Sequence, residues 1–162
     1  MITRYKYIMQ MCIEMLQILG KKYPQLKDIR IEEVVYDNLY IAKCECEKIG
    51  EYIYCKKGRI HNIRPTRILL TNKIFEKKEE DILFIFIHEC SHAITPQTER
   101  KVKNSYVRID HSRQFYENFL ELLLIAYNAN KISYKYTDIN ELMKRDNRKE
   151  NIKNDLKIHS KR

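Results

Sequence analysis

Residues 82–92 read Ile82-Leu-Phe-Ile-Phe-Ile-His88-Glu-Cys-Ser-His92, an apolar run that ends in an HExxH sequence. A helix over this stretch would bury the apolar run and place His88 and His92 one turn apart on one face. Two imidazoles in that arrangement can hold a zinc ion, and Glu89 then faces the water that the metal binds. The stretch therefore predicts a buried helix with a metal site toward its C-terminal end.

Length and composition set the broad class. A chain of 162 residues fits one domain with its own core. Five cysteines and a charged N-terminus without a secretory apolar segment predict reduced thiols and an intracellular protein, in the cytoplasm or nucleus and not secreted. No apolar run approaches the roughly 18 residues of a membrane span, so we expect no membrane contact.

The chain is strongly basic. It has 31 Lys and Arg residues against 22 Asp and Glu residues, a formal net charge of +9. Such an excess favours a polyanionic partner, DNA or RNA first, because bound phosphates release counterions. A composition rich in lysine for solubility explains the same excess equally well.

Two periodicities divide the chain before the motif helix. Residues 5–19 carry apolar side chains at helical spacing and are followed by Gly20 and Pro24, which predicts a first helix with one buried face. From Asp28 to about Ile63 the period falls to two and turn residues recur, which predicts an antiparallel meander. The strands expected in this sheet of three or four strands are residues 29–31, 39–46, 52–55 and 67–71.

The motif helix is expected to begin near Lys77 and to end before Pro96, which cannot continue a helix. Residues 94–110 then predict a loop, and a second helix follows with Asp110 or Ser112 as its N-cap. The fold class we predict is α+β. The apolar stripe expected on the second helix consists of Phe115, Phe119, Leu122, Leu123 and Tyr127.

We expect the folded domain to span residues 1–130, and residues 131–162 to form a basic C-terminal tail or helix. The second segment holds ten Lys and Arg residues and five Asp and Glu residues, so ten minus five gives +5 of the total +9. Its later part has few apolar residues, which predicts a frayed helix or a disordered tail.

Two histidines leave a catalytic zinc site incomplete, because such sites usually have three protein ligands and one position for water. The extended pattern HExxHxxGxxH does not supply the third ligand, since Thr98 stands where its last histidine would be. We favour His111, because it lies where the second helix begins and its ring can fold back over the first helix. The alternatives are Glu117 and Glu121 of that helix and, as weaker candidates more typical of solvated surface histidines, His61 and His159.

The region from about Arg67 to Leu124 resembles the minimal zincin domains of the SprT-like and WLM-type metallopeptidases. In those families a strand precedes the HExxH helix, and a later His-x-x-x-Phe or His-x-x-x-Trp sequence opens the next helix. Here the strand is Arg67-Ile-Leu-Leu-Thr, and the later sequence is His111-Ser-Arg-Gln-Phe115. The earlier helix and sheet agree with these families only in their order.

The resemblance implies a minimal zincin fold: an N-terminal helix, a small antiparallel sheet, the HExxH helix and a helix that carries the third ligand. It implies one Zn²⁺ ion, with Glu89 as the general base that assists attack of zinc-bound water on a peptide carbonyl. It also implies Phe115 as a packing residue between the two helices. The zinc ligands that it implies are His88, His92 and His111.

The cysteines form a second group of metal-ligating residue types. Cys44, Cys46, Cys55 and His61 could ligate zinc together, but their spacing does not match a zinc knuckle. Cys44 and Cys46 alternate on one strand face, and we interpret them as small core residues. Cys90 within the motif is expected to pack on the buried side of its helix, and nothing indicates a cysteine that faces the metal.

Basic residues after the motif helix are candidates for contact with nucleic acid, namely Arg100, Lys101, Lys103 and Arg108. Aromatic and basic residues also alternate earlier, at Tyr52, Tyr54, Lys56, Lys57, Arg59 and Arg64. In the segment after the motif helix, Tyr106 and Arg108 are candidates for stabilising an oxyanion.

The function these patterns predict is a zinc metalloendopeptidase that acts on a protein or peptide substrate, among them proteins associated with DNA or RNA. The alternative is a non-catalytic nucleic-acid-binding or assembly protein that retains the fold and uses the metal as a staple. Glu89 favours the enzyme, because a purely structural metal site needs no base beside an open coordination position.

Overall fold

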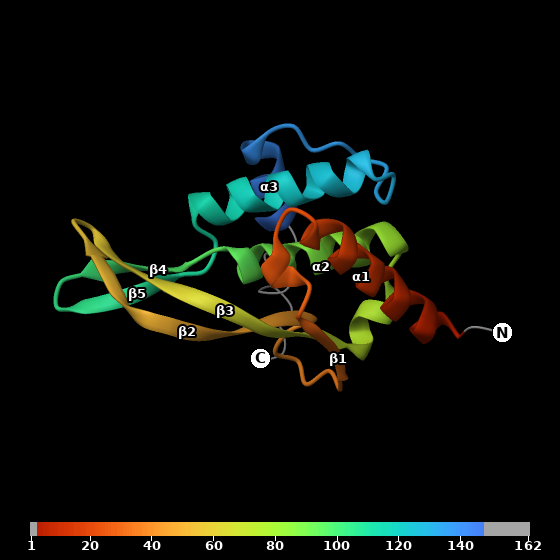
Figure 1. Cartoon of the computed structure of the whole chain (residues 1–162), viewed down its shortest axis with the longest axis horizontal. Helices are drawn as coiled ribbons and strands as arrows, with labels where there is room; N and C mark the ends of the chain where they lie inside the picture. Colours follow the sequence, from red (N-terminus) through yellow and green to blue (C-terminus); the bar gives the residue numbers. More distant parts are fainter. Residues whose placement is uncertain (1–2, 148–162) are drawn as a thin grey trace, which may run out of the picture.

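The computed structural model of the chain describes residues 3–147. Helices α1, α2 and α3 lie on one face of a five-stranded sheet, with α2 next to the sheet and α3 farther from it (Figure 1). This arrangement confirms the predicted α+β class. The elements are α1 (Arg4–Gly20), the 3-10 helix η1 (Pro24–Leu26), β1 (Arg30–Val34), β2 (Ala42–Cys55), β3 (Gly58–Thr71), the 3-10 helix η2 (Asn72–Glu76), α2 (Glu79–Ile94), β4 (Gln97–Val102), β5 (Ser105–Ile109) and α3 (Arg113–Asn128).

The sheet is mixed, so the prediction of a purely antiparallel sheet of three or four strands was wrong. β1 runs parallel to β3, with Arg30 opposite Arg67 and Val34 opposite Thr71. The remaining pairs, β2 with β3, β3 with β4 and β4 with β5, are antiparallel. Because β2 pairs with the same end of β3 that β1 does, β1 has to add on the opposite side of that strand.

β2 and β3 form one long hairpin, and its irregularities account for turn signals in the sequence. Gly50 has a φ of +71°, a left-handed conformation that suits glycine, and it lies where the strand pairing shifts. Pro65 lies at a second shift, between the parts of β3 that pair with β1 and with β4. The separate strands predicted at residues 39–46 and 52–55 belong to one strand, β2, and residues 67–71 are the end of β3.

Residues 97–109 form the β4–β5 hairpin, and the prediction of a loop here was wrong. Lys103, with a φ of +55°, makes the turn between the two strands. Gly58 allows β3 to approach β4, because a Cβ atom there would lie 2.0 Å from the carbonyl oxygen of Glu99. Much of the hairpin lies beyond the helices (Figure 1), so its sequence carries charged side chains where a covered strand would carry apolar ones.

α2 supplies the centre of the core. Phe86 and Ile87 are completely buried, and Phe84 packs against Phe119 of α3 with ring centroids 5.0 Å apart. Cys90 is also completely buried, and burial raises its pKa well above the usual value. The predicted packing role of Cys90 is therefore confirmed.

The predicted helices on either side of α2 are confirmed as α1 and α3. Ser112, not Asp110, is the N-cap of α3, because its hydroxyl oxygen accepts a hydrogen bond from the backbone N–H of Phe115 at 3.2 Å. Tyr127 of the predicted apolar stripe lies at its partly exposed border. The buried members of the stripe are Phe115, Phe119, Leu122 and Leu123.

The chain still packs on the helices after residue 130. Leu142 is completely buried, and residues 139–147 are helical. Arg145 reaches Asp81 at the start of α2, with 2.7 Å between guanidinium nitrogen and carboxylate oxygen. The domain boundary at residue 130 stays a prediction, but the beginning of the expected tail contributes to the core. The later part, residues 148–162, lies outside the described residues.

Replacement of Leu142 by alanine tests whether this segment belongs to the folded unit. We expect Leu142→Ala to lower the free energy of unfolding by about 2–4 kcal/mol, because it leaves a cavity among buried side chains. Lys144→Ala, on the same helical segment but exposed, is the matched control and should change it by less than about 0.5 kcal/mol. Urea unfolding followed by circular dichroism measures both, and equal midpoints would show that the segment is not part of the core.

Candidate metal centre

Three histidines converge at the C-terminal end of α2. His88 and His92 lie one turn apart on α2, and His111 directly precedes α3, as the HExxH spacing and the choice of third ligand predicted. One ring nitrogen of each lies within 4.8 Å of the others. The three residues line a cavity of about 510 Å³. This cluster can hold a metal ion.

Two of the ring nitrogens are spaced as two ligands of one tetrahedral ion would be. Two nitrogen ligands at bond lengths of about 2.0–2.1 Å lie about 3.3 Å apart in tetrahedral geometry. The Nε2 atoms of His88 and His111 are 3.2 Å apart. The ring centroids are also nearly equidistant, at 5.0 Å for His88 and His92, 4.9 Å for His88 and His111, and 5.1 Å for His92 and His111. The three rings therefore lie close enough together to contribute to one metal site.

Asp146 orients His88, and the sequence had not identified it. Its Oδ1 atom lies 2.9 Å from His88 Nδ1, and its Oδ2 accepts a hydrogen bond from the Tyr116 hydroxyl at 3.0 Å. A carboxylate can only accept here, so His88 donates through Nδ1 and its Nε2 lone pair faces the centre. Burial raises the pKa of Asp146, but the hydrogen bond and charge of His88, the charge of His111 and the hydrogen bond from Tyr116 together outweigh burial, and the pKa lies below its usual value.

Glu89 is held beside the cluster by the sheet. Its Oε1 atom accepts a hydrogen bond from the backbone N–H of Cys44 on β2 at 3.0 Å. Its Oε2 atom lies 3.9 Å from His88 Nε2. The side chain is buried, with 8% of its surface exposed. One carboxylate oxygen is thus anchored to β2 and the other lies close to the nitrogens of the cluster.

The ring of His92 packs against an aromatic side chain of α3. Phe115 stacks on it with centroids 4.4 Å apart and also contacts the rings of His88 and His111 at 4.9 Å. Phe115 therefore packs between the two helices, as expected. Burial, followed by the neighbouring His88 and His111, lowers the pKa of His92 to about 2. Its imidazole is neutral at physiological pH and keeps a lone pair for a ligand.

The other candidates for the third ligand lie elsewhere. Glu121 pairs with Lys22 and accepts a hydrogen bond from Tyr23, and Glu117 pairs with Arg113 on the exposed side of α3. His61 is buried against the ring of Tyr52 and not solvated, so the expectation of surface exposure was wrong. His159 lies outside the described residues.

The interpretation of Cys44 and Cys46 as core residues was wrong for Cys46, whereas Cys44 is half-buried and packs against the core. Both line the cavity that the histidines line, and Cys46 is exposed. They do share one face of β2, as their spacing predicted, but this face borders the cavity as well as the core. Cys55, at the end of β2, is also exposed.

The basic residues of the β4–β5 hairpin are divided between its two faces, because neighbouring residues of a strand point in opposite directions. Lys101 pairs with Tyr106, whose ring packs on Arg59 at 4.0 Å, so Tyr106 is engaged away from the histidines. Arg108 lines the cavity and pairs with Asp110 at 2.6 Å. Of the two oxyanion candidates, Arg108 is therefore the one at the site. The remaining basic residues of the hairpin, Arg100 and Lys103, are exposed.

Comparison of the chain with models of protein families, with curated proteins and with solved structures found no match. Within residues 3–147, none of the helices combines the length and apolar character needed to cross a bilayer. The fold and the site therefore define the class directly: an α+β protein with a cluster of three histidines that can bind a metal ion.

Metal titration tests the roles of His111 and Asp146. We expect Asp146→Asn to weaken Zn²⁺ binding by about 10–100-fold, because it removes the charge that orients His88. His111→Ala should weaken it further, since a ligand itself is lost. Competition with a chromophoric chelator measures both affinities.

Glu117→Gln is the matched control, because Glu117 is a carboxylate of α3 that pairs with Arg113 and lies outside the cluster. Its zinc affinity should equal that of the unchanged protein. An unchanged affinity in His111→Ala would remove this residue from the site, and an unchanged affinity in Asp146→Asn would reject its orienting role.

Proposed function

We propose that this protein is a zinc-dependent metalloendopeptidase of the zincin type. The observation that carries the proposal is the position of Glu89. Its carboxylate is buried, anchored at one oxygen and 3.9 Å from His88 Nε2 at the other. Burial of a carboxylate costs free energy, and a metal site that only stabilised the fold would not need a buried carboxylate beside it.

The ligand set supports zinc as the metal. Three neutral imidazoles with a fourth position left for water form a common catalytic zinc site, whereas calcium and magnesium prefer oxygen ligands. The orienting carboxylate of Asp146 is also typical of histidines that ligate zinc. The resemblance to SprT-like and WLM-type metallopeptidases agrees with this choice.

The protein's side chains would divide the reaction as follows. Bound zinc supplies a Lewis acid that polarises a carbonyl and lowers the pKa of water. Glu89 accepts the proton of the attacking water and passes it to the leaving amine. The N–H of Cys44 holds Glu89 in position for both transfers. Arg108, at the cavity wall, can stabilise negative charge on the carbonyl oxygen.

The shape of the site suits an extended peptide. Residues 42–46 of β2 form one wall of the cavity and residues 108–112 form another. β2 pairs with β3, and its other edge borders the cavity, where the N–H of Cys44 points to Glu89. A peptide that added to this edge through backbone hydrogen bonds would pass the proposed base.

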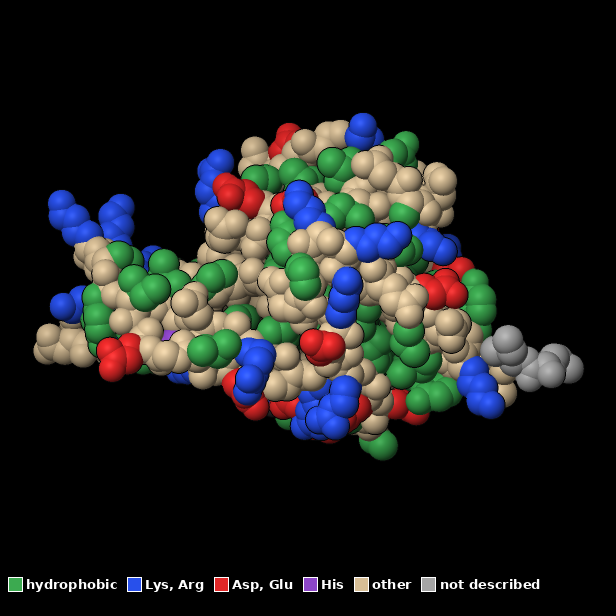
Figure 2. Space-filling model, viewed as in Figure 1, with side chains coloured by type: hydrophobic (Ala, Val, Ile, Leu, Met, Phe, Trp, Pro, Cys, Tyr) green, Lys and Arg blue, Asp and Glu red, His purple; other side chains and the backbone are tan. Residues whose placement is uncertain are grey.

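We further propose that some substrates are proteins associated with nucleic acid. Figure 2 shows Lys and Arg side chains beside hydrophobic ones on the part of the sheet that projects beyond the helices. The turns there contain Lys56, Lys57 and Lys103. The guanidinium of Arg59 pairs with Glu99 and lies over two tyrosine rings, 3.7 Å from the centre of Tyr52 and 4.0 Å from that of Tyr106. Aromatic and basic side chains together suit single-stranded nucleic acid.

The Glu89→Gln variant distinguishes a metalloendopeptidase from a non-catalytic nucleic-acid-binding protein. We expect this variant to retain zinc and to lose cleavage of casein and histones by about 10²–10⁴-fold, because it removes the general base. Zinc content is measured after dialysis, and cleavage is measured with and without single-stranded DNA. Stimulation by DNA of histone cleavage would support the choice of substrate.

Glu117→Gln is again the matched control and should cleave like the unchanged protein. Equal cleavage by Glu89→Gln and the unchanged protein would refute the role of Glu89. If the zinc-loaded protein binds DNA but cleaves neither substrate under any condition, the non-catalytic binding module is the correct account.

A further inference from the structure

The cavity contains a pair of thiols that the proposed hydrolysis does not use. Cys44 and Cys46 lie on the face of β2 that borders the cavity, and their sulfur atoms are 3.6 Å apart. This distance is a hydrogen-bond contact between thiols, and a disulfide requires about 2.05 Å. The two sulfurs can therefore bond after a small movement.

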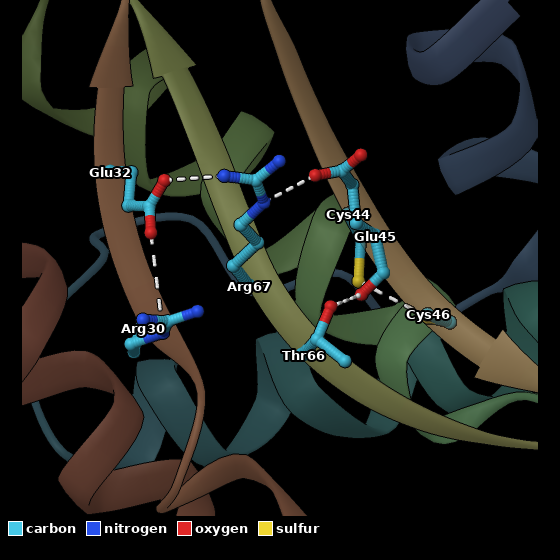
Figure 3. Close-up of polar contacts among 7 residues, drawn as sticks. All are labelled: Arg30, Glu32, Cys44, Glu45, Cys46, Thr66 and Arg67. Carbon is cyan, nitrogen blue, oxygen red and sulfur yellow. Dashed lines mark hydrogen bonds and ion pairs between the residues drawn. The ribbon is translucent and has the colours of Figure 1, made fainter.

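An irregularity in the sheet holds the pair in this position. The register of β2 and β3 shifts between Glu45 and Cys46. The Thr66 hydroxyl donates a hydrogen bond to the carbonyl oxygen of Glu45 at 3.0 Å, and the Glu45 carboxylate pairs with Arg67 (Figure 3). Glu45 is thus fixed on the face of the sheet opposite the two sulfurs. Glu45, the residue between the two cysteines, is therefore held through both its backbone and its side chain.

The two thiols differ in reactivity. The hydrogen bond from Cys44 and the charge of Arg108 lower the pKa of Cys46, whereas the hydrogen bond to Cys46 and burial raise the pKa of Cys44. Cys46 is also exposed, whereas Cys44 is half-buried. A thiolate is the reactive form of cysteine, so Cys46 is the nucleophile of the pair and Cys44 is the resolving thiol.

The remaining cysteines are poorly placed for the same chemistry. Cys12 and Cys90 are buried, and burial raises the pKa of Cys12 to about 12 and that of Cys90 well above its usual value. Cys55 is exposed at the end of β2 but is not among the residues that line the cavity. It offers a solvent-accessible thiol for comparison.

We propose that Cys44 and Cys46 form a redox-active dithiol that hydrogen peroxide converts to an intramolecular disulfide. The Cys46 thiolate attacks one peroxide oxygen, the O–O bond breaks, and the hydroxide released takes up a proton to form water. The sulfur of Cys44 then displaces the hydroxyl group from the Cys46 sulfenic acid, which forms the S–S bond and a second water. The two thiols lose two electrons and two protons, and the peroxide gains them.

The disulfide would act on the proposed active site through Glu89. The N–H of Cys44 is the group that anchors Glu89, so a movement of Cys44 toward Cys46 displaces that anchor. Both cysteines also form part of the cavity wall. Oxidation should therefore lower cleavage, and this consequence rests on the proposed function. Formation of the disulfide itself does not.

Peptide mass spectrometry tests the proposal on the full chain. Trypsin cleavage after Lys43 and Lys48 releases a peptide that contains Cys44 and Cys46 and no other cysteine. After peroxide treatment and blocking of free thiols, we expect this peptide to carry no blocking group. Its mass should be lower than that of the reduced peptide by two hydrogen atoms. Dithiothreitol should restore both thiols. The peptide that contains Cys55 should carry the blocking group and should not be joined to another peptide.

Variants separate the possible results. Cys55→Ser should form the same disulfide, and Cys46→Ser should not. Glu89→Gln should also form it, so the disulfide can be observed even if the protein cleaves nothing. Recovery of Cys44 and Cys46 as two free thiols, or as separately oxidised residues, under conditions that oxidise Cys55 would overturn the proposal.

If the protein cleaves casein, the ratio of activity after and before peroxide treatment tests the link to Glu89. We expect most activity to be lost in the unchanged protein and recovered with dithiothreitol. The ratio should stay near one in Cys46→Ser. Full activity in protein shown to contain the disulfide would reject the link and leave the dithiol itself intact.

Discussion

Burial of the apolar run of α2 is the constraint on which the site depends. Residues 82–87 pack between the sheet and α3, and each large apolar side chain buried there contributes about 1.5–3 kcal/mol. The helix is therefore fixed in rotation, and its next turn has to present its polar residues where the sheet and the start of α3 meet. His88 and His92 then face His111, while Glu89 faces β2.

Polar groups at this junction are stabilised by hydrogen bonds from segments that are distant in sequence. β2 donates a backbone N–H to Glu89, and residues 139–147 bring Asp146 to His88. Tyr116 of α3 donates to the same aspartate. Since an unpaired buried carboxylate is very costly, each of these contacts is a condition for the fold as well as for the orientation of the site. The segment after residue 130 thus contributes Asp146 to the candidate metal centre.

The sequence predicted the parts of this arrangement that depend on local periodicity. α1, α2 and α3, the HExxH pair and His111 follow from helical spacing, a cap and a known motif. β1 was placed in an antiparallel sheet and β4–β5 in a loop, because strand partners and directions are set by packing over long sequence distances. Asp146 lies in a charged stretch without periodicity, so nothing local distinguished it. Cys44 and Cys46 were assigned to the core, because alternation gives the face of a strand and not whether that face borders a cavity.

Two sets of metal-ligating side chains therefore share one cavity, three imidazoles and two thiols, and we propose that the metal binds to the imidazoles. X-ray absorption spectroscopy of the zinc-loaded protein distinguishes them most directly, because zinc–nitrogen and zinc–sulfur bonds differ in length. We expect nitrogen or oxygen neighbours alone at about 2.0–2.1 Å, with the multiple scattering of three imidazoles. A sulfur neighbour at about 2.3 Å would place the metal on the cysteines and contradict the proposed catalytic site.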